Sequence, residues 1–253
     1  MKQFIALILL FLYSENQQLP TGKYLIDMES EQVACELLIG TDHTYEVRLS
    51  VLDTEDIVWC AILSNGHYSS SKDNLLLHDD HYSFNWELSI SDNLVNVSHG
   101  YCFLNKKRIL SYQKENVDIL PPNKEYLNRI NTQIEKYIVQ QDNPHVELCQ
   151  YEDRNHHYTL AIENNGGYHL YLKDILVSEG KWSQQDNILV LHDMQLDHDF
   201  TMAVGNRTLL SIGIPGEFGG TMFEIVATSL KNDNNNIITP RNHRGGYSRI
   251  INQ

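Results

Sequence analysis

Along most of the chain, apolar and polar residues alternate in short runs separated by turn-forming residues. A β-strand with one buried face has this period of two, because successive side chains point to opposite faces of the sheet. The runs lie at 24–28, 45–51, 84–90, 158–162, 168–172, 209–212 and 222–226. Between them, Asn65-Gly66, Asp73-Asn74, residues 165–167 and Asp186-Asn187 supply residues that tolerate positive φ in tight hairpins. The pattern predicts an all-β protein made of antiparallel meanders.

One stretch of sequence occurs twice. Residues 66–79 (GHYSSSKDNLLLHD) align without a gap on residues 180–193 (GKWSQQDNILVLHD), at an offset of 114 residues. The same offset places Trp86 on Phe200, Leu88 on Met202, Cys35 on Cys149 and His43 on His157, and a shift of one residue aligns Gly100 with Gly213. The repeat predicts two copies of one unit, at 22–113 and 146–228, rather than a short-repeat solenoid.

The segment between the copies, residues 114–145, has a different pattern. Its apolar residues recur every three or four positions, at Leu127, Ile130, Ile134, Tyr137 and Ile138. With Asn123 as a cap and Pro144 as a stop, this spacing predicts an amphipathic helix that packs across a sheet or plugs one end of a barrel. Residues 229–253 have little apolar content, and we expect a loosely ordered tail there.

The repeated hairpin has a recognisable form, which is a Gly-x-aromatic followed by a polar turn and an L-x-L-x-D strand. It consists of Gly66, Tyr68, Leu75, Leu77 and Asp79 in the first copy and of Gly180, Trp182, Leu189, Leu191 and Asp193 in the second. This hairpin resembles that of the small secreted lipocalin-like β-barrel domains of bacteria. The resemblance implies an antiparallel barrel or half-barrel with a possible apolar cavity, and it carries over no enzymatic residues.

The two copies could close separately or share one larger barrel. Each is long enough to form a small barrel or sandwich alone, and the linker is long enough to decouple them. We therefore expect two related units joined by one helix. Barrels filled by Tyr68, Trp86, Trp182 and Phe200 would exclude a ligand cavity and leave binding at the surface.

The net charge and the N-terminal sequence indicate which partners the protein can bind and in which compartment it is located. The 253 residues carry a net charge of −14 and no basic stripe, which argues against nucleic acid as a partner. Residues 1–14 have Lys2, an apolar run that is too short to span a membrane and then a small residue, as a signal peptide does. We expect a secreted or periplasmic protein with no permanent membrane span.

The four cysteines, Cys35, Cys60, Cys102 and Cys149, are too widely spaced for a CxxC metal or redox motif. In an exported chain they could form disulfides in three pairings. Alternatively they are small buried hydrophobic residues, an interpretation that suits Cys60 in its apolar stretch.

Candidate metal ligands follow the repeated strands. His78, Asp79 and His81 in the first copy and His192, Asp193 and His198 in the second offer imidazole and carboxylate groups, which suit zinc or another divalent ion. The alternative, which we favour, is that each strand ends at a leucine and the aspartate caps the backbone of a polar turn. This role explains why both copies carry the His-Asp pair. We expect no cofactor.

No complete catalytic motif is present, whether a nucleophile elbow, a zincin helix, a phosphate-binding loop or a dinucleotide fingerprint. We therefore expect a non-catalytic binding protein whose partner is a small apolar ligand or another protein. The alternative is a secreted hydrolase or metal-binding protein in which polar residues converge between the two repeats. The glycine-rich residues 213–220 are either a long hairpin loop or the rim of a binding site.

Overall fold

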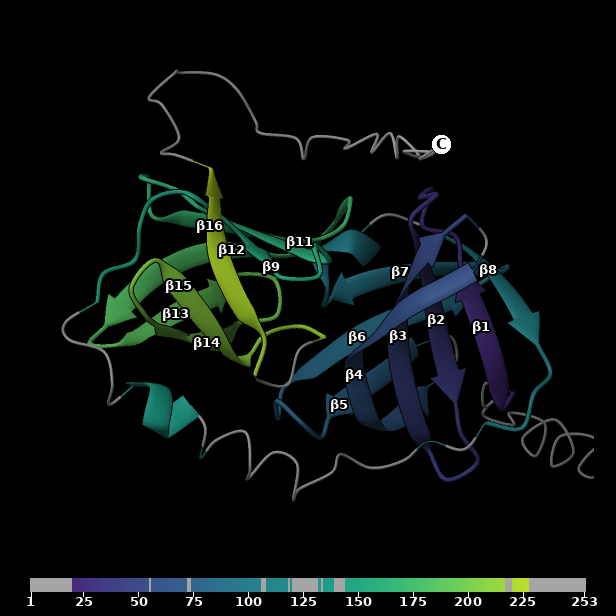
Figure 1. The fold of residues 1–253 in the computed structure, drawn as a ribbon. Coiled ribbons are helices and arrows are strands. Elements are labelled where there is room, and N and C mark those ends of the chain that lie inside the picture. Colours follow the sequence, from purple (N-terminus) through teal and green to yellow (C-terminus); the bar gives the residue numbers. More distant parts are fainter. Residues whose placement is uncertain are drawn as a thin grey trace, which may run out of the picture.

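The structure, a computed structural model, describes residues 20–54, 56–71, 74–105, 108–117, 119, 132, 134–138, 144–216 and 220–227. Figure 1 shows these residues as two β-structures that follow one another along the chain. The predicted signal peptide at 1–14 and the predicted tail at 229–253 lie outside the described residues.

Each β-structure is a closed antiparallel barrel of eight strands. Barrel 1 contains β1 (Gly22–Ile26), β2 (Val33–Ile39), β3 (Thr44–Asp53), β4 (Asp56–Ser71), β5 (Asn74–Asp79), β6 (Asn85–Ser91), β7 (Leu94–His99) and β8 (Arg108–Gln113). Barrel 2 contains β9 (Gln150–Asp153), β10 (Tyr158–Ile162), β11 (Gly167–Leu172), β12 (Ile175–Gln185), β13 (Ile188–Asp193), β14 (His198–Val204), β15 (Thr208–Gly213) and β16 (Met222–Ala227). The predicted all-β fold with two related antiparallel units is confirmed.

Strand order follows chain order in both barrels. Each strand pairs with its neighbours in sequence, and the first strand closes on the last, through β1–β8 in barrel 1 and β9–β16 in barrel 2. Short hairpin connections favour this up-and-down arrangement, and closure leaves few free strand edges.

The repeat corresponds to matching strands. Tyr68 pairs with Leu77 and Trp182 pairs with Leu191, so β4–β5 and β12–β13 have the same register at the 114-residue offset. The 114-residue offset continues to the end of β7 and β15. The pairing register shifts at the same place in both copies, after Glu87 in β6 and after Thr201 in β14, so the shift does not change the offset. Glu87 pairs with His99 as Thr201 pairs with Gly213. The predicted match of Gly100 with Gly213 is therefore wrong, and His99 is the counterpart.

Before β4 the offset is different. Tyr45 faces Gly66 and Tyr168 faces Gly180, which makes β3 the counterpart of β11 at an offset of 123 residues. Ile39 pairs with Tyr45 as Ile162 pairs with Tyr168, so β2 corresponds to β10. The alignment of Cys35 with Cys149 and of His43 with His157 was therefore wrong.

A longer hairpin in the first copy causes the change of offset. Residues 50–60 extend the β3–β4 hairpin, whereas the two residues 173–174 turn the chain between β11 and β12. We call residues 50–60 the β3–β4 arm. A hairpin tip can lengthen without disturbing a barrel, because only the strand portions inside the sheet must keep their register.

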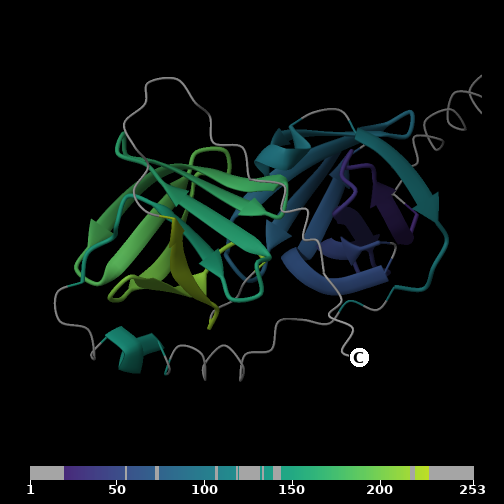
Figure 2. The same cartoon turned by 45° about the horizontal axis from the view of Figure 1, so that its top comes forward.

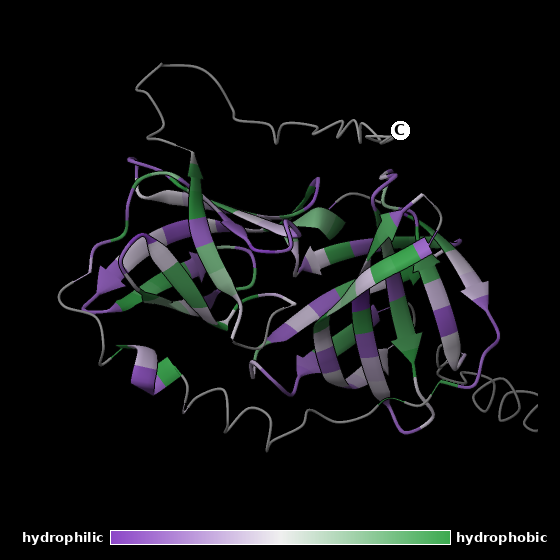
Figure 3. Ribbon diagram, in the orientation of Figure 1, coloured by the Kyte–Doolittle hydropathy of each residue, from purple (hydrophilic) through white to green (hydrophobic). Residues whose placement is uncertain are grey.

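Hydrophilic and hydrophobic residues alternate along strands of both barrels (Figure 3). The side chains that alternation turns inward are buried and fill the barrels. Tyr68, Leu75 and Leu77 are buried in barrel 1, as predicted, and Trp86 beside them is fully buried. In barrel 2, Leu189, Leu191 and Phe200 are buried, whereas Trp182 is only partly buried and donates its indole N–H to the Glu163 carbonyl at 3.0 Å.

The two barrels lie side by side (Figure 2). They pack against each other, and their buried apolar residues form one continuous cluster. Trp59 of barrel 1 stacks on His157 of barrel 2 at 4.6 Å between ring centroids. The Tyr82 hydroxyl donates to the Ile214 carbonyl at 2.6 Å. The long linker therefore connects two barrels that are in direct contact.

The described part of the linker includes one helical turn, at 134–138. Ile134 is buried against Ala203 of β14 and Leu210 of β15, and the Tyr137 hydroxyl lies 2.7 Å from that of Thr208. The turn therefore packs across the outer face of barrel 2, one of the two placements predicted. Among the described residues, no helix has the length and apolar character needed to cross a membrane.

The four cysteines are free thiols. Cys35 and Cys149 are buried, and Cys102 is partly buried. The expectation that Cys60 is buried was wrong, because its side chain is exposed on the β3–β4 arm, in a part of β4 that pairs with β3 and, among the described residues, not with β5.

Candidate functional site

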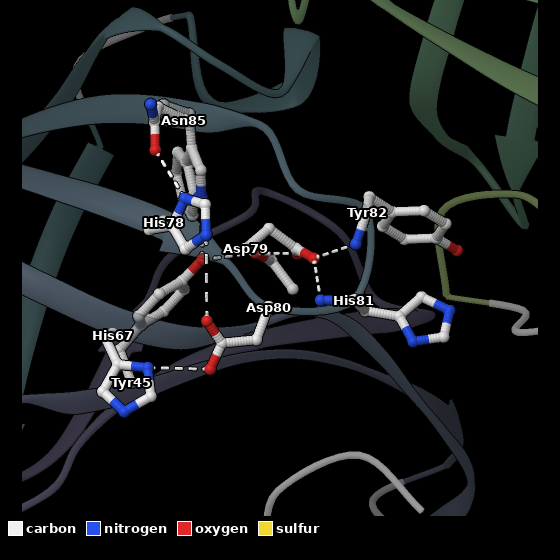
Figure 4. A network of polar contacts seen from close by, with 10 residues as sticks. Tyr45, His67, His78, Asp79, Asp80, His81, Tyr82 and Asn85 are labelled. Carbon is white, nitrogen blue, oxygen red and sulfur yellow. Dashed lines mark hydrogen bonds and ion pairs between the residues drawn. The ribbon is translucent and has the colours of Figure 1, made fainter. Parts of the chain in front are cut away.

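The turn after β5 is built around the carboxylate of Asp79, which is fully buried. Its Oδ1 accepts the backbone N–H groups of His81 and Tyr82, at 2.8 and 2.6 Å. Its Oδ2 accepts the hydroxyl of Ser64 from β4 at 2.5 Å. Figure 4 shows Asp79 with the turn residues His81 and Tyr82. One side chain thus satisfies two turn amides and ties the turn to the neighbouring strand.

Barrel 2 repeats this arrangement at the same offset. Asp193 Oδ1 accepts the backbone N–H groups of Gln195 and Leu196, both at 2.9 Å, and Oδ2 accepts the Ser178 hydroxyl at 2.5 Å. The predicted turn-capping role of the repeated aspartate is confirmed in both copies. The recurrence of all three contacts explains why the L-x-L-x-D strand is repeated.

A tyrosine extends each network into the barrel. The Ser64 hydroxyl donates its proton to Asp79, so it accepts a hydrogen bond from the Tyr45 hydroxyl, whose oxygen is 2.7 Å from that of Ser64. The Tyr45 hydroxyl also accepts the indole N–H of Trp86 at 3.2 Å. Tyr168 lies 2.7 Å from Ser178 in the same way. Burial raises the pKa of Asp79, and its hydrogen bonds from Ser64 and the turn amides act in the opposite direction.

The two histidines before these aspartates lie on the outside of their barrels. His78 Nδ1 is 2.8 Å from Asn85 Oδ1, and His192 Nδ1 is 2.8 Å from Asp199 Oδ1. Asp80 Oδ2 is 2.7 Å from His67 Nδ1. Figure 4 shows the contacts of His78 with Asn85 and of His67 with Asp80 in barrel 1. Because side chains alternate along a strand, His78 and His192 point to the face opposite to that of the buried aspartates.

His81 and His198 lie instead beside Tyr82 of barrel 1, and His198 reaches this ring from barrel 2. Their rings are 4.6 and 5.7 Å from that of Tyr82, and His198 also packs against Phe84 at 5.0 Å and Phe200 at 4.8 Å. Burial lowers the pKa of His81 to about 4 and also lowers that of His198. We call Tyr82, Phe84, His198 and Phe200 the inter-barrel ring cluster.

The six candidate metal ligands are thus divided among different places. Asp79 and Asp193 are buried in turns, His78 and His192 are outside, and His81 and His198 pack beside Tyr82. Within the described ranges, no three His, Cys, Asp or Glu residues form a group that could hold a metal ion. Metal binding by these residues stays a prediction.

The inter-barrel contact was missed by the sequence analysis. Tyr82 and Ile214 are 132 residues apart, and neither lies in a periodic run. The one available signal was the density of aromatic residues and histidine at 81–86, directly after the repeated strand. The glycine-rich 213–216 segment contributes Ile214 and Gly216 to this contact, so these residues face barrel 1.

The β3–β4 arm is the other feature outside the repeat. Ile57 and Val58 are 60% and 56% exposed. Val58 is the extra residue at an irregularity of the β3–β4 pairing, in which Val51 pairs with Trp59 and Leu52 pairs with Ile57. Trp59 anchors the arm to barrel 2 through His157 and Tyr158, whose ring is 5.7 Å away. Trp59 therefore links the arm to barrel 2, while Ile57 and Val58 stay exposed.

Comparisons with known proteins do not place the chain in a family. No protein-family model matches it, and a comparison with curated proteins gives no match. Among solved structures, the crystal structure of the DNA polymerase sliding clamp from Bacillus subtilis aligns with a TM-score of 0.15 and 10% identity. The alignment covers 87% of this chain and 60% of the clamp chain, so this chain spans less than two thirds of the clamp.

Proposed function

We propose that the chain is an exported, non-catalytic binding protein whose partner is a macromolecule held by the β3–β4 arm. The exposure of Ile57 and Val58 carries this proposal. Exposed apolar residues that neighbour each other on a projecting strand are unusual on a soluble surface and are typical of interaction sites.

The backbone of the arm supports the same conclusion. In the described part of the chain, β4 pairs with β5 only from Gly66 onward, so residues 56–65 have β3 as their one strand partner. Gly216 of barrel 2 lies against Ala61 and Leu63. Residues 56–60 thus offer a strand edge that an extended segment of another chain can pair with, as in β-strand addition.

The negative charge of the arm tip indicates what kind of segment would pair with the arm. Asp53 and Asp56 are exposed at the arm tip, and the whole chain carries a net charge of −14. A second copy would bring like charges together, whereas an extended segment with apolar and basic residues would complement the tip. Barrel 2 closes the corresponding hairpin with two residues, so the fold itself does not require the arm.

Two further parts of the proposal rest on other features. A lipocalin-like origin is supported by the up-and-down order of eight strands in each barrel, an order that lipocalins also have. Export is supported by the signal-peptide pattern of residues 1–14. The alternative, a hydrolase or metal-binding protein, has less support, because the groups that meet between the barrels are mainly packed rings.

The experiment is site-specific photo-crosslinking in the native host. A photoreactive residue at Val58 should give a discrete adduct, and Ile57→Asp should abolish it. Val226 is 53% exposed on β16 and provides the control position, where no adduct is expected. Absence of an adduct at position 58, or the same adducts at both positions, would contradict the proposal.

A further inference from the structure

The backbone of the β3–β4 arm directs hydrogen-bonding groups to an open strand edge. Leu52 donates its N–H to the Gln32 carbonyl, on the β2 side of β3. Ser50, two residues earlier, faces β2 in the same way, so its pair Cys60 directs its N–H and carbonyl away from β3. Among the described residues, β5 pairs with β4 only from Gly66 onward. A further strand can therefore pair with the arm at this edge.

The tip of the arm combines acidic and apolar residues. The sequence has three acidic residues at positions 53–56, of which Asp53 and Asp56 are exposed in the structure. Directly after them, Ile57 and Val58 expose their apolar side chains. A strand that adds to this edge would therefore be complementary if it carried both basic and apolar residues.

The chain itself contains such a combination in residues 228–253, which follow β16 and lie outside the described residues. These residues include four basic side chains and one acidic side chain, so their net charge is +3. Since the whole chain carries −14, residues 1–227 carry −17. The segment after β16 is therefore opposite in charge to the rest of the chain and to the arm tip.

Within this segment, residues 247–251 (YSRII) have the composition of a strand. Tyrosine and isoleucine favour strands, and the stretch contains neither glycine nor proline. Arg249 supplies a positive charge directly beside its two isoleucines. The other apolar pair, Ile237 and Ile238, follows three asparagines and comes shortly before Pro240, and both residue types are depleted in strands. Residues 247–251 are therefore the better match to the arm.

The last strand of barrel 2 lies close to the arm. Phe223 of β16 and Trp59 of the arm both pack on Tyr158, with ring centroids 6.2 and 5.7 Å from that of the tyrosine. Ala227, the last residue of β16, follows Phe223 by four residues, which is about 13 Å along a strand. Residues 228–246 can span up to about 60 Å. The segment after β16 is therefore long enough to reach the arm of its own chain.

We propose that residues 247–251 pair with the open edge of the arm in the same chain and occupy it until an external partner displaces them. This inference rests on the function proposed above, because it concerns the same edge. Arg249 complements the acidic tip, and Ile250 covers apolar surface at Ile57 and Val58. A segment of the same chain has a high effective concentration at the arm, so only a partner that binds more favourably gains access. The edge is then protected from unspecific pairing.

The test is photo-crosslinking of the purified full chain, with no other protein present. A photoreactive residue at Val58 should crosslink to residues 247–251, as identified by mass spectrometry, and the product should migrate as a monomer on a denaturing gel. Ile250→Asp should lower the crosslink yield about tenfold, because it removes the apolar contact and adds an acid beside the acidic tip. Ile237→Asp makes the same change outside residues 247–251 and is the matched control, which should leave the yield unchanged.

No crosslink to residues 247–251, a crosslink only between two chains, or equal yields in the two variants would each overturn the inference. The experiment in the native host separates this result from a failure of the proposed function. There, Ile250→Asp should increase the adduct of the external partner at position 58, because the competing segment is weakened. An external adduct without the internal crosslink contradicts only the inference. An internal crosslink without any external adduct, even in Ile250→Asp, contradicts only the proposed function.

Discussion

At the scale of single residues, the repeated aspartate shows how one side chain can fix a turn. Asp79 accepts hydrogen bonds from two backbone amides and from Ser64, all in a region closed to water. Its sequence neighbour Asp80 has a similar charge but lies nearer the surface, where its carboxylate pairs with His67. The carboxylate of Asp79 therefore has a structural role inside the protein, whereas that of Asp80, the next residue, lies near the surface.

We expect Asp79→Ala to lower the free energy of unfolding by about 3 kcal/mol, because three buried donors lose their acceptor. Asp79→Asn should cost less, about 1 kcal/mol, since an amide oxygen can still accept the turn N–H groups and burial already favours a neutral side chain at this position. Urea unfolding measures both. Asp80→Ala is the control and should cost under about 1 kcal/mol; equal losses for the two alanine variants would refute the role of Asp79.

At the scale of elements, the β3–β4 hairpin differs most between the copies. The hairpin matches its counterpart up to the Leu49–Ala61 pair, and residues 50–60, which barrel 2 lacks, lengthen it and bring Trp59 onto His157 of barrel 2. The arm thus contributes a contact between barrels with its inner side chain, while Ile57 and Val58 stay exposed. The arm therefore packs against barrel 2 through Trp59 and exposes Ile57 and Val58 to solvent.

Trp59→Ala should release the arm from barrel 2 and uncover His157. Burial lowers the pKa of His157, so removal of the indole should raise that pKa towards its ordinary value of about 6.5. Loss of a partly buried tryptophan should also cost about 2 kcal/mol of unfolding free energy. An NMR titration of the His157 ring measures the shift; Val58→Ala is the control, and an unchanged titration curve in Trp59→Ala would count against the stacked contact.

At the scale of the whole molecule, the two barrels behave as one packed body. The inter-barrel ring cluster joins Tyr82 and Phe84 of barrel 1 to His198 and Phe200 of barrel 2, and a single buried cluster runs through both. His81 packs against Tyr82 of this cluster, and His157 stacks on Trp59 at a second contact between the barrels. The contact therefore depends on imidazole rings that are packed in their neutral form.

We expect the contact to weaken in acid. His81 has a pKa of about 4, and the pKa values of His157 and His198 are also lowered by burial, although Asp199 and Asp193 act in the opposite direction on His198. An unfolded histidine titrates near about 6.5, so below that pH the unfolded chain binds more protons than the folded one. Stability is then fully present above about pH 6.5 and falls as the pH decreases towards 4.

Thermal unfolding between pH 7.5 and pH 4.5, about the range over which these groups titrate, measures this effect. His198→Phe should make Tm fall less steeply in acid, because it replaces the titrating ring with one that packs similarly. His67→Gln alters an exposed histidine outside the contact and serves as the control. Identical slopes for the two variants would show that His198 does not contribute to the acid sensitivity.

Much of this architecture follows from the sequence alone. Short-range alternation determined the strands, the 114-residue repeat determined that two related units exist, and the His-Asp pair at each strand end determined the capped turns. These features depend on residues within one hairpin, so a short window of sequence contains all the information that they need.

Only the tertiary structure decided how the strands close and how the barrels meet. Closure pairs Tyr24 with Tyr112, and the inter-barrel contact pairs Tyr82 with Ile214, over separations that no local pattern encodes. The exposure of Cys60 likewise depends on which distant strands surround it. Hydrophobic periodicity determines which face of a strand is buried, but the surroundings of that face come from residues far along the chain.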